Sequence, residues 1–555
     1  MSTEEIADAL ELTAKLMELH EENPFKVKAV ANGAYKLSKT RIDLHGKTQE
    51  EIAQLEGIGK GIAAKITEFL DKGTTAELEE LRSKTPAGVI EIMGVKGLGP
   101  KKVRQLWHEL NIESIGELLY ACNENRLVDL KGFGTKTQES VKQSIEFAQN
   151  NSGKLHYANA EKIANDLLNS LKKVKGVFED VSFTGELRRK NDIITKIELL
   201  SSVNDLGRAK TGLGNAGYEE DPEIENTFVS TKTACPIYIY LCEPENFYKE
   251  LFLTTGSADF VADFLEVEMD APASEEAIFE ELNLQYVEPE LRESPNIIAL
   301  AEQNKIPQLV EYKDLKGILH NHSTYSDGMH SLEEMAVHCK NLGFEYLGIC
   351  DHSQSAFYAD GLKPETVLTQ QKEIEKLNQQ LAPFKIFKGI ESDILNDGSL
   401  DYPEDILKTF DFIVASVHSN LKMNEEKANE RLIKAIENPH TTILGHPTGR
   451  LLLGRPGYPI DHKKIIDACA ANGVIIELNA HPYRLDIDWR WIPYCLEKGV
   501  KISINPDAHQ KEGYSDMHYG VNSARKGMLD KMNCFNALSL EEIEKYFVSR
   551  KNAIK

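Results

Sequence analysis

Histidines and acidic residues recur at the ends of apolar, strand-like stretches in the second half of the chain. Twelve of the 16 histidines lie between residues 311 and 520, many in short motifs such as GILHNHSTYSDG, YLGICDHS and ILGHPTGR. When strands and helices alternate to form a barrel, the C-terminal strand ends all open onto one face. We therefore predict that nine side chains meet there as a metal site with several ions: His320, His322, Asp327, His352, Glu391, His418, His446, Asp507 and His509.

The order of the elements in this region supports that arrangement. Residues 311–555 alternate about seven apolar runs with amphipathic segments such as SLEEMAVHCKNLG, which is the pattern of a parallel α/β barrel. His320 and His322 share one face of a strand, because side chains alternate with a period of two. Six imidazoles against three carboxylates favour Mn²⁺, Zn²⁺ or Fe²⁺ over Mg²⁺, which prefers oxygen ligands.

Paired glycines mark the N-terminal region. Residues 1–150 read as helical, interrupted by the similar segments LEGIGKGIAAKI, IMGVKGLGPKKV and LVDLKGFGTKTQESV. In each, Gly-x-Gly permits a tight turn, and the following helix offers N–H groups and a positive dipole end to a phosphate. A single copy would fit a simple helical turn equally well, but three copies favour helix-hairpin-helix motifs that hold the DNA backbone. The predicted DNA contacts are Gly57, Gly59, Lys60, Gly97, Gly99, Lys101, Gly132, Gly134 and Lys136.

The middle region and the charge distribution limit the remaining choices. Residues 151–310 mix strand-like pieces (DVSFTGELR, CPIYIYLC) with a helical one (SEEAIFEELNL), which indicates an α+β domain. Lys and Arg minus Asp and Glu come to −4 for residues 1–150, −14 for 151–310 and −6 for 311–555. Because DNA is an anion, we expect its contacts to avoid the middle region.

No stretch of the sequence indicates export or membrane insertion. No apolar run approaches 18 residues, and MSTEEIADAL is acidic where a signal peptide would be basic. The eight cysteines contain no CxxC and fit reduced thiols. We expect a cytoplasmic monomer that does not bind membranes.

The order of these parts resembles a bacterial family X DNA polymerase with a C-terminal PHP (polymerase and histidinol phosphatase) domain. NPFKVKAVANGAYKL and the glycine hairpins match its DNA-binding domain, TGELRR, CEPENF and TTGS match the polymerase core, and HNHSTYSDG, DHS, GIESDI, VHS, GHPTGR and DAH match the PHP motifs. The resemblance implies an all-α helix-hairpin-helix domain at 1–150, an α+β nucleotidyltransferase-like domain at 151–310 and an α/β distorted TIM-like PHP barrel at 311–555.

The resemblance also implies three divalent ions. His320, His322, Glu391 and Asp507 would hold the first, Glu391 would bridge to a second held by His418 and His446, and Asp327, His352 and His509 would hold the third.

The polymerase motif departs from the family pattern at its acidic positions. Gly185 is present, but Glu186 stands where Ser is expected. Lys196 and Glu198 occupy the two positions of Asp-x-Asp, and Tyr238 occupies the third acidic position. Nucleotidyl transfer needs carboxylates that hold two divalent ions, and an ammonium group among them repels those ions. We predict a polymerase core without activity.

The leading hypothesis is a metal-dependent DNA phosphoesterase in base-excision repair. It would act as a 3′–5′ exonuclease, 3′-phosphatase or abasic-site endonuclease on gapped, nicked or 3′-ended DNA. Arg450 and Arg484 are candidates to steer the substrate phosphate, or else structural ion-pair partners. Lys65 matches the Schiff-base lysine of the lyase activity of eukaryotic members, although an exposed helical lysine is the interpretation we favour.

Two other functions stay open. One is a small-molecule phosphatase of the histidinol-phosphatase type, and the other is a non-catalytic scaffold that binds DNA ends.

Overall fold

The computed structural model describes residues 2–39, 44–55, 57–123, 126–128, 130–174, 176–233, 235–265 and 267–554. Its contacts divide the chain into two compact units, Met1–Ser152 and Gly153–Lys555. The boundary we expect at residue 150 lies next to this division. The one expected at residue 310 falls inside the larger unit, because side chains of residues 153–310 bind the region that follows.

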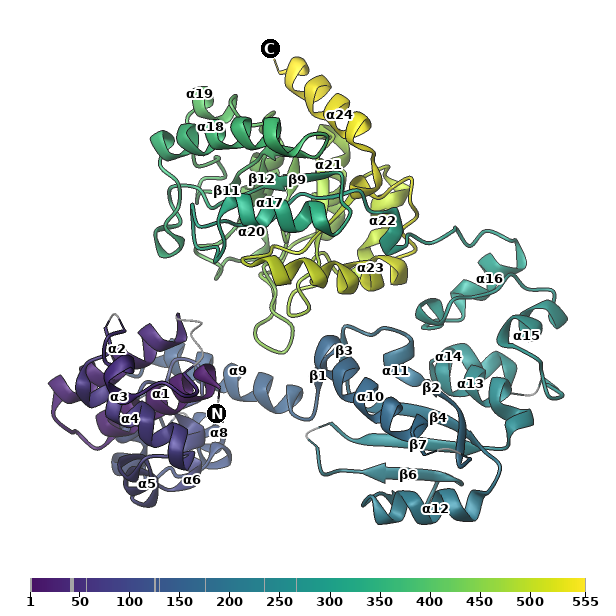
Figure 1. Cartoon of the computed structure of the whole chain (residues 1–555), viewed down its shortest axis with the longest axis horizontal. Helices are drawn as coiled ribbons and strands as arrows, with labels where there is room; N and C mark the ends of the chain where they lie inside the picture. The colour runs from purple at the N-terminus through teal and green to yellow at the C-terminus, as the bar shows by residue number, and fades with distance from the viewer. Residues whose placement is uncertain are drawn as a thin grey trace. The chain divides into compact units, whose positions relative to one another are not determined.

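The first unit is helical throughout its described residues, as the purple and blue ribbon of Figure 1 shows. A capping box at Ser2 starts α1, whose Ile6, Leu10 and Met17 recur at helical spacing and are fully buried. The helices are α1 (Thr3–Leu19), α2 (Pro24–Ser38), α3 (Gln49–Ile52), α4 (Lys60–Lys72), α5 (Ala76–Ser83), α6 (Ala87–Ile92), α7 (Pro100–Leu110), α8 (Ile115–Asn123) and α9 (Thr135–Asn151).

A mixed five-stranded sheet organises residues 153–310. Its strand order is β2-β4-β7-β6-β5, with β4 parallel to β7 and the other neighbours antiparallel. The strands are β2 (Phe178–Phe183), β4 (Ile197–Val203), β5 (Glu219–Glu220), β6 (Thr227–Ser230) and β7 (Ile237–Cys242), with β1 (Leu155–His156) paired to β3 (Ile193–Ile194). The helices are α10 (Tyr157–Lys172), α11 (Gly185–Arg188), α12 (Leu206–Asn215), α13 (Phe247–Thr255), α14 (Ala258–Val261), α15 (Glu275–Glu281) and α16 (Asn296–Glu302). This is the predicted α+β arrangement.

Two parallel sheets form the centre of the last region. One has the order β8-β9-β10 and the other β11-β12-β13-β14-β15. The strands are β8 (Gly317–Ile318), β9 (Tyr346–Ile349), β10 (Lys385–Lys388), β11 (Glu391–Asp393), β12 (Val414–Ser416), β13 (Ile443–Leu444), β14 (Ile475–Asn479) and β15 (Ile502–Asn505). The predicted parallel α/β class is therefore present as two sheets. Isolated bridges, His352 with Glu391 and Asn321 with Ala508, pair residues just beyond the strands of one sheet with residues of the other.

Amphipathic helices cover these strands on the outside (Figure 1). They are α17 (Leu332–Asn341), α18 (Pro364–Leu381), α19 (Glu404–Leu407), α20 (Glu425–Ile436), α21 (His462–Asn472), α22 (Ile492–Glu497), α23 (Met517–Lys526) and α24 (Leu540–Ala553). The apolar faces of α17 to α23 share one large core with the strands, whereas Ile543 and Phe547 of α24 belong to a second cluster with Phe412 and Val414. Because all strands run parallel, residues at their C-terminal ends lie on one side of the fold.

Candidate metal centre

Glu391, the first residue of β11, is the hub of the centre and is fully buried. From its Oε1 the distances are 3.1 Å to His418 Nε2, 3.1 Å to His446 Nε2 and 3.4 Å to His320 Nε2. From its Oε2 they are 2.9 Å to His352 Nδ1 and 3.7 Å to His322 Nε2. Five imidazoles from four different strand ends thus surround one carboxylate.

The other three predicted ligands join this cluster. Asp507 Oδ1 lies 2.9 Å from His322 Nε2. Asp327 Oδ1 lies 3.4 Å from His509 Nε2 and 3.6 Å from His352 Nε2. The ring of His509 stacks on that of His322 at 4.2 Å. The structure therefore brings all nine predicted side chains together.

The donor set fits divalent cations. Three groups have ligand atoms within 4.8 Å of one another: His322, Asp327, His352 and His509; His320, His322 and Glu391; and His352, Glu391 and His418. Five buried atoms of the cluster have no hydrogen-bond partner: His320 Nε2, His322 Nδ1, His352 Nδ1, Glu391 Oε2 and His446 Nδ1. Buried polar atoms are nearly always paired, so this concentration of atoms without a hydrogen-bond partner suits the binding of divalent ions.

Neighbouring charges and burial shift the pKa values of the clustered histidines in opposite directions. Burial opposes a charge on His418, but Glu391 and Asp393 outweigh it and raise the pKa of His418 to about 10. Burial, helped by His509 and His352, lowers the pKa of His322 to about 3. Ligands bind metals in their deprotonated forms, so ion binding would release protons from the first kind of histidine.

Two supporting carboxylates were missed by the sequence reasoning. Glu477 is fully buried on β14, lies 2.7 Å from His320 Nδ1 and accepts from the backbone N–H of His446 at 2.8 Å. Asp393 lies 2.6 Å from His418 Nδ1. A carboxylate on the far nitrogen fixes the orientation of a ligating imidazole. The signals were a charged residue inside the apolar strand IIELN and an acid two positions after Glu391 on the same strand.

The three glycine hairpins of the first unit share one geometry. Gly57, Gly97 and Gly132 have positive φ angles of 80°, 91° and 85°. The residue that follows each of them, Ile58, Leu98 or Phe133, is buried. Gly59 and Gly99 precede the first residues of α4 and α7 without a side-chain cap, and Gly134 precedes α9.

These turns leave their backbone accessible. A methyl group added at Gly59, Gly97, Gly99, Gly132 or Gly134 would meet no atom within 4 Å. Lys60, Lys101 and Lys136 are exposed beside them. Open N–H groups at a helix start next to a lysine suit a phosphate oxygen.

Lys196 and Glu198, which we expect at the acidic positions of the polymerase pattern, form an ion pair in the middle sheet. Glu198 is buried on β4 and pairs in parallel register with Tyr238 of β7. Its Oε1 lies 2.7 Å from Lys196 Nζ and accepts from Tyr240 OH at 2.8 Å. Lys196 also lies over the Tyr238 ring, 5.6 Å from its centre. Among the described residues of 153–310, no three metal-ligating side chains meet.

Family models match the first unit and part of the last region. A helix-hairpin-helix domain model matches residues 1–75, a SAM-like helix-hairpin-helix tandem matches residues 89–146 and a PHP domain model matches residues 319–481. The protein named DNA polymerase/3′-5′ exonuclease PolX of Bacillus subtilis (strain 168) is 32% identical over 575 residues, which cover 98% of this chain and 99% of that protein. The chain belongs to the PolX family.

Two further relatives match only part of the chain. A probable phosphatase of Acetivibrio thermocellus is 29% identical over 199 residues, 34% of this chain and 78% of that protein. A probable phosphatase of Thermoanaerobacter sp. (strain X514) is 33% identical over 146 residues, 24% of this chain and 57% of that protein. Both matches are confined to part of this PolX-family chain.

The two arginines that we considered for phosphate binding lie in different surroundings. Arg450 donates to Asp488 at 2.6 Å, to Asp192 at 3.3 Å and to the backbone oxygen of Arg484 at 2.9 Å. These bonds favour the structural alternative for Arg450. Arg484 Nε lies 3.7 Å from Asp507 Oδ2, at the edge of the metal centre, which keeps it a candidate for the substrate phosphate.

Lys65 forms an ion pair with Glu77, which also binds Lys26. The ion pair supports a structural role for Lys65, but its side chain is only 19% exposed, so the exposed lysine that we expected is wrong in that respect.

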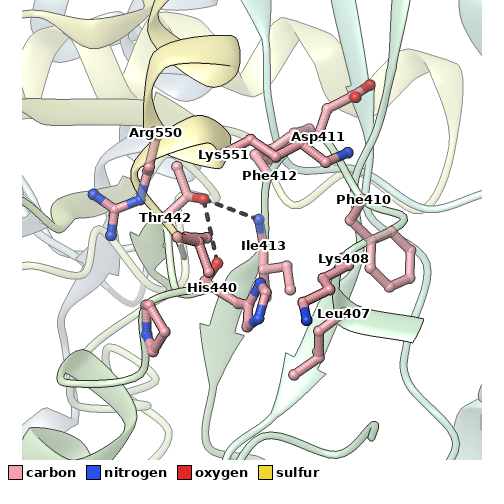
Figure 2. A pocket seen from close by; sticks show the side chains of 12 residues that line it. Leu407, Lys408, Phe410, Asp411, Phe412, Ile413, His440, Thr442, Arg550 and Lys551 are labelled. Atoms are coloured by element: carbon pink, nitrogen blue, oxygen red, sulfur yellow. Dashed lines mark hydrogen bonds between the residues drawn. The ribbon is translucent and has the colours of Figure 1, made fainter. Parts of the chain in front are cut away.

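A separate cavity of about 240 Å³ lies at the other ends of the strands (Figure 2). Phe412 and Ile413 in its wall directly precede β12, and Thr442 directly precedes β13. None of the nine predicted ligands lines it. It is therefore distinct from the metal centre.

The structure contains no helix in its described residues that is long and apolar enough to cross a membrane. All eight cysteines are free thiols.

Proposed function

We propose that this chain is a metal-dependent DNA phosphoesterase. The observation that carries the proposal is the crowding of five imidazoles around the buried Glu391, with five polar atoms of the cluster left unpaired. Membership of the PolX family and the PHP match support hydrolytic chemistry on a phosphate ester. The relative's name mentions a 3′-5′ exonuclease, which we extend to this chain together with a role in base-excision repair.

The nine-residue cluster would hold three divalent ions, with Mn²⁺, Zn²⁺ or Fe²⁺ suited to its histidine-rich composition. Bound ions of this kind supply an activated water and neutralise charge on the phosphoryl oxygens. The chain itself would orient the ligands through Glu477 and Asp393, and Arg484, beside Asp507, would bind a phosphate oxygen.

The hairpins would hold the DNA, which we take to be gapped, nicked or 3′-ended. Their exposed glycine turns and the lysines beside them contact phosphates without reading bases. The middle domain would not transfer nucleotides, since Lys196 neutralises the one carboxylate at the acidic positions. We interpret it as a scaffold for the barrel region.

End-labelled gapped DNA incubated with the full chain and Mn²⁺ tests the proposal. We expect shortening or end dephosphorylation that is abolished by His320→Ala and retained by His338→Ala, a histidine of α17 outside the cluster. Retained hydrolysis in His320→Ala, with bound metal unchanged by elemental analysis, contradicts the proposal. Nucleotide incorporation on the same DNA is expected to be absent, and any extension that Glu198→Ala abolishes contradicts the inactive core.

The matches to probable phosphatases favour a second candidate, a phosphatase of small molecules. If histidinol phosphate or p-nitrophenyl phosphate is hydrolysed far faster than DNA, and DNA does not compete, this second function replaces the first.

A further inference from the structure

Two neighbouring aromatic side chains stand out of the surface beside the metal centre. Phe357 is 87% exposed and Tyr358 is 69% exposed, both on the short turn η5 (Phe357–Ala359). Isolated exposed apolar residues are common in proteins, but an adjacent pair of large rings in water forgoes substantial burial energy. An exposed pair of this kind beside the metal centre suits a ligand with a flat apolar face.

The turn that carries the rings is firmly anchored. The backbone N–H of Ser355 donates to Asp401 Oδ2 at 2.7 Å, and its hydroxyl donates to Asp393 Oδ2 at 2.8 Å. Ala356 and Ala359, on either side of the pair, are buried. The backbone therefore holds both rings outward in advance of any ligand, which limits the entropy lost on binding.

The pair adjoins the metal ligands. The Tyr358 ring lies 6.1 Å from the ring of His352, whose Nδ1 is 2.9 Å from Glu391. Asp393, which anchors the turn, also orients His418.

We propose that Phe357 and Tyr358 form a stacking platform for a nucleobase of an unpaired DNA strand end, whose phosphate lies at the metal centre. This rests on the proposed phosphoesterase function and adds its substrate class. Every base has a π-face, so stacking of this kind is independent of sequence, but a base inside a duplex has both faces covered. The platform therefore selects frayed or single-stranded ends over paired ones.

A 2-aminopurine reporter at the 3′-terminal position tests the platform without turnover. The oligonucleotide carries a phosphorothioate at its last linkage and is titrated into the full chain with Mn²⁺. We expect wild-type protein to quench the fluorescence, and Phe357→Ala/Tyr358→Ala to weaken binding about 5- to 150-fold, the range reported for loss of base stacking. Phe357→Leu/Tyr358→Leu should resemble the alanine variant, whereas Phe357→Tyr and Tyr358→Phe should retain quenching.

Tyr312→Ala serves as the matched control, because Tyr312 is 41% exposed and lies before β8, at the opposite strand ends. Retained quenching in the leucine variant shows apolar docking without stacking and overturns the proposal.

Turnover separates this proposal from the function on which it rests. The alanine variant should raise KM for an unpaired end that carries a base and leave hydrolysis of the same end without a base unchanged. Equal losses on both ends mean that the turn only supports the fold, which overturns the platform. If wild-type protein hydrolyses no DNA but quenching follows the variant pattern, the phosphoesterase function fails and the platform stands. If it hydrolyses DNA without quenching, the platform fails alone.

Discussion

Glu391 and Glu198 are both buried carboxylates on central strands, yet their surroundings differ completely. Glu198 is satisfied by Lys196 and Tyr240, so nothing is left for an ion to bind. Glu391 has an unpaired Oε2 and neighbours whose own ring nitrogens are unpaired. A buried acid therefore indicates a metal site only when its partners leave lone pairs available to an ion. An acid whose charge is neutralised by an ammonium group has a structural role and is not available as a metal ligand.

The largest expected effect separates the two glutamates directly. Glu391→Gln should lower DNA hydrolysis on the order of 10³-fold, because it removes the shared anionic ligand. Glu198→Gln should leave hydrolysis unchanged. Initial rates with Mn²⁺ and the metal content of both variants measure this. Equal losses in both would mean that the middle sheet takes part in the reaction.

The supporting carboxylates give the next largest effect. Asp393→Asn and Glu477→Gln should each weaken metal affinity or activity by about 10- to 100-fold, because the imidazole beside each of them loses its orienting partner. Asp397→Asn, an exposed acid paired with Lys434, is the control. Metal titrations followed by activity provide the measurement. Unchanged metal affinity in both variants would show that the imidazoles need no such orientation.

A smaller effect is expected at the hairpins, which should change binding of DNA and not the chemistry. Replacing Lys60, Lys101 or Lys136 by Gln should weaken affinity for all sequences alike and reduce the salt dependence by about one phosphate contact each. Lys15→Gln on α1, a lysine paired with Glu11, should leave the slope unaltered. Fluorescence anisotropy over a range of salt concentrations measures the slope. A slope that stays constant in all three variants places the DNA elsewhere.

The smallest effect concerns Asp192, which ties the middle domain to Arg450. Burial raises the pKa of Asp192 to about 6 although Arg450 opposes the shift. An unfolded aspartate titrates near 3.9. Between about pH 4 and pH 6 the folded state holds the extra proton, so the free energy of unfolding should fall as pH rises through that window.

Asp192→Asn should remove this pH dependence of the free energy of unfolding. The stability of the variant relative to wild type should therefore improve from pH 4 to pH 7. Melting temperatures at several pH values measure the change, with the exposed Asp166→Asn as control. A parallel pH profile for wild type and Asp192→Asn would assign the slope to other groups.

Several features of the fold could be predicted because they depend on neighbouring residues. Gly57, Gly97 and Gly132 were found from their spacing, since a turn with positive φ between two helices selects glycine locally. The contacts across residue 310 could not be predicted. Lys526 of α23 donates to the backbone oxygen of Arg189 at 2.9 Å and to Asn191 at 2.8 Å, across more than 330 positions in the chain. Such contacts join residues 153–310 to the region that follows and leave no local signal in the sequence.

The family, the helical hairpins and the nine candidate ligands could be predicted, because short motifs at strand ends and glycine turns are local patterns. The partners of those groups follow from the folded chain. In the fold, Glu477 and Asp393 contact the imidazoles of His320 and His418, and Arg450 forms ion pairs. Glu198 is paired with Lys196, and the side chains of Phe357 and Tyr358 are exposed to solvent. The physical reason is that a side chain's chemistry depends on charges and burial contributed by residues far away in the chain, which no local spacing records.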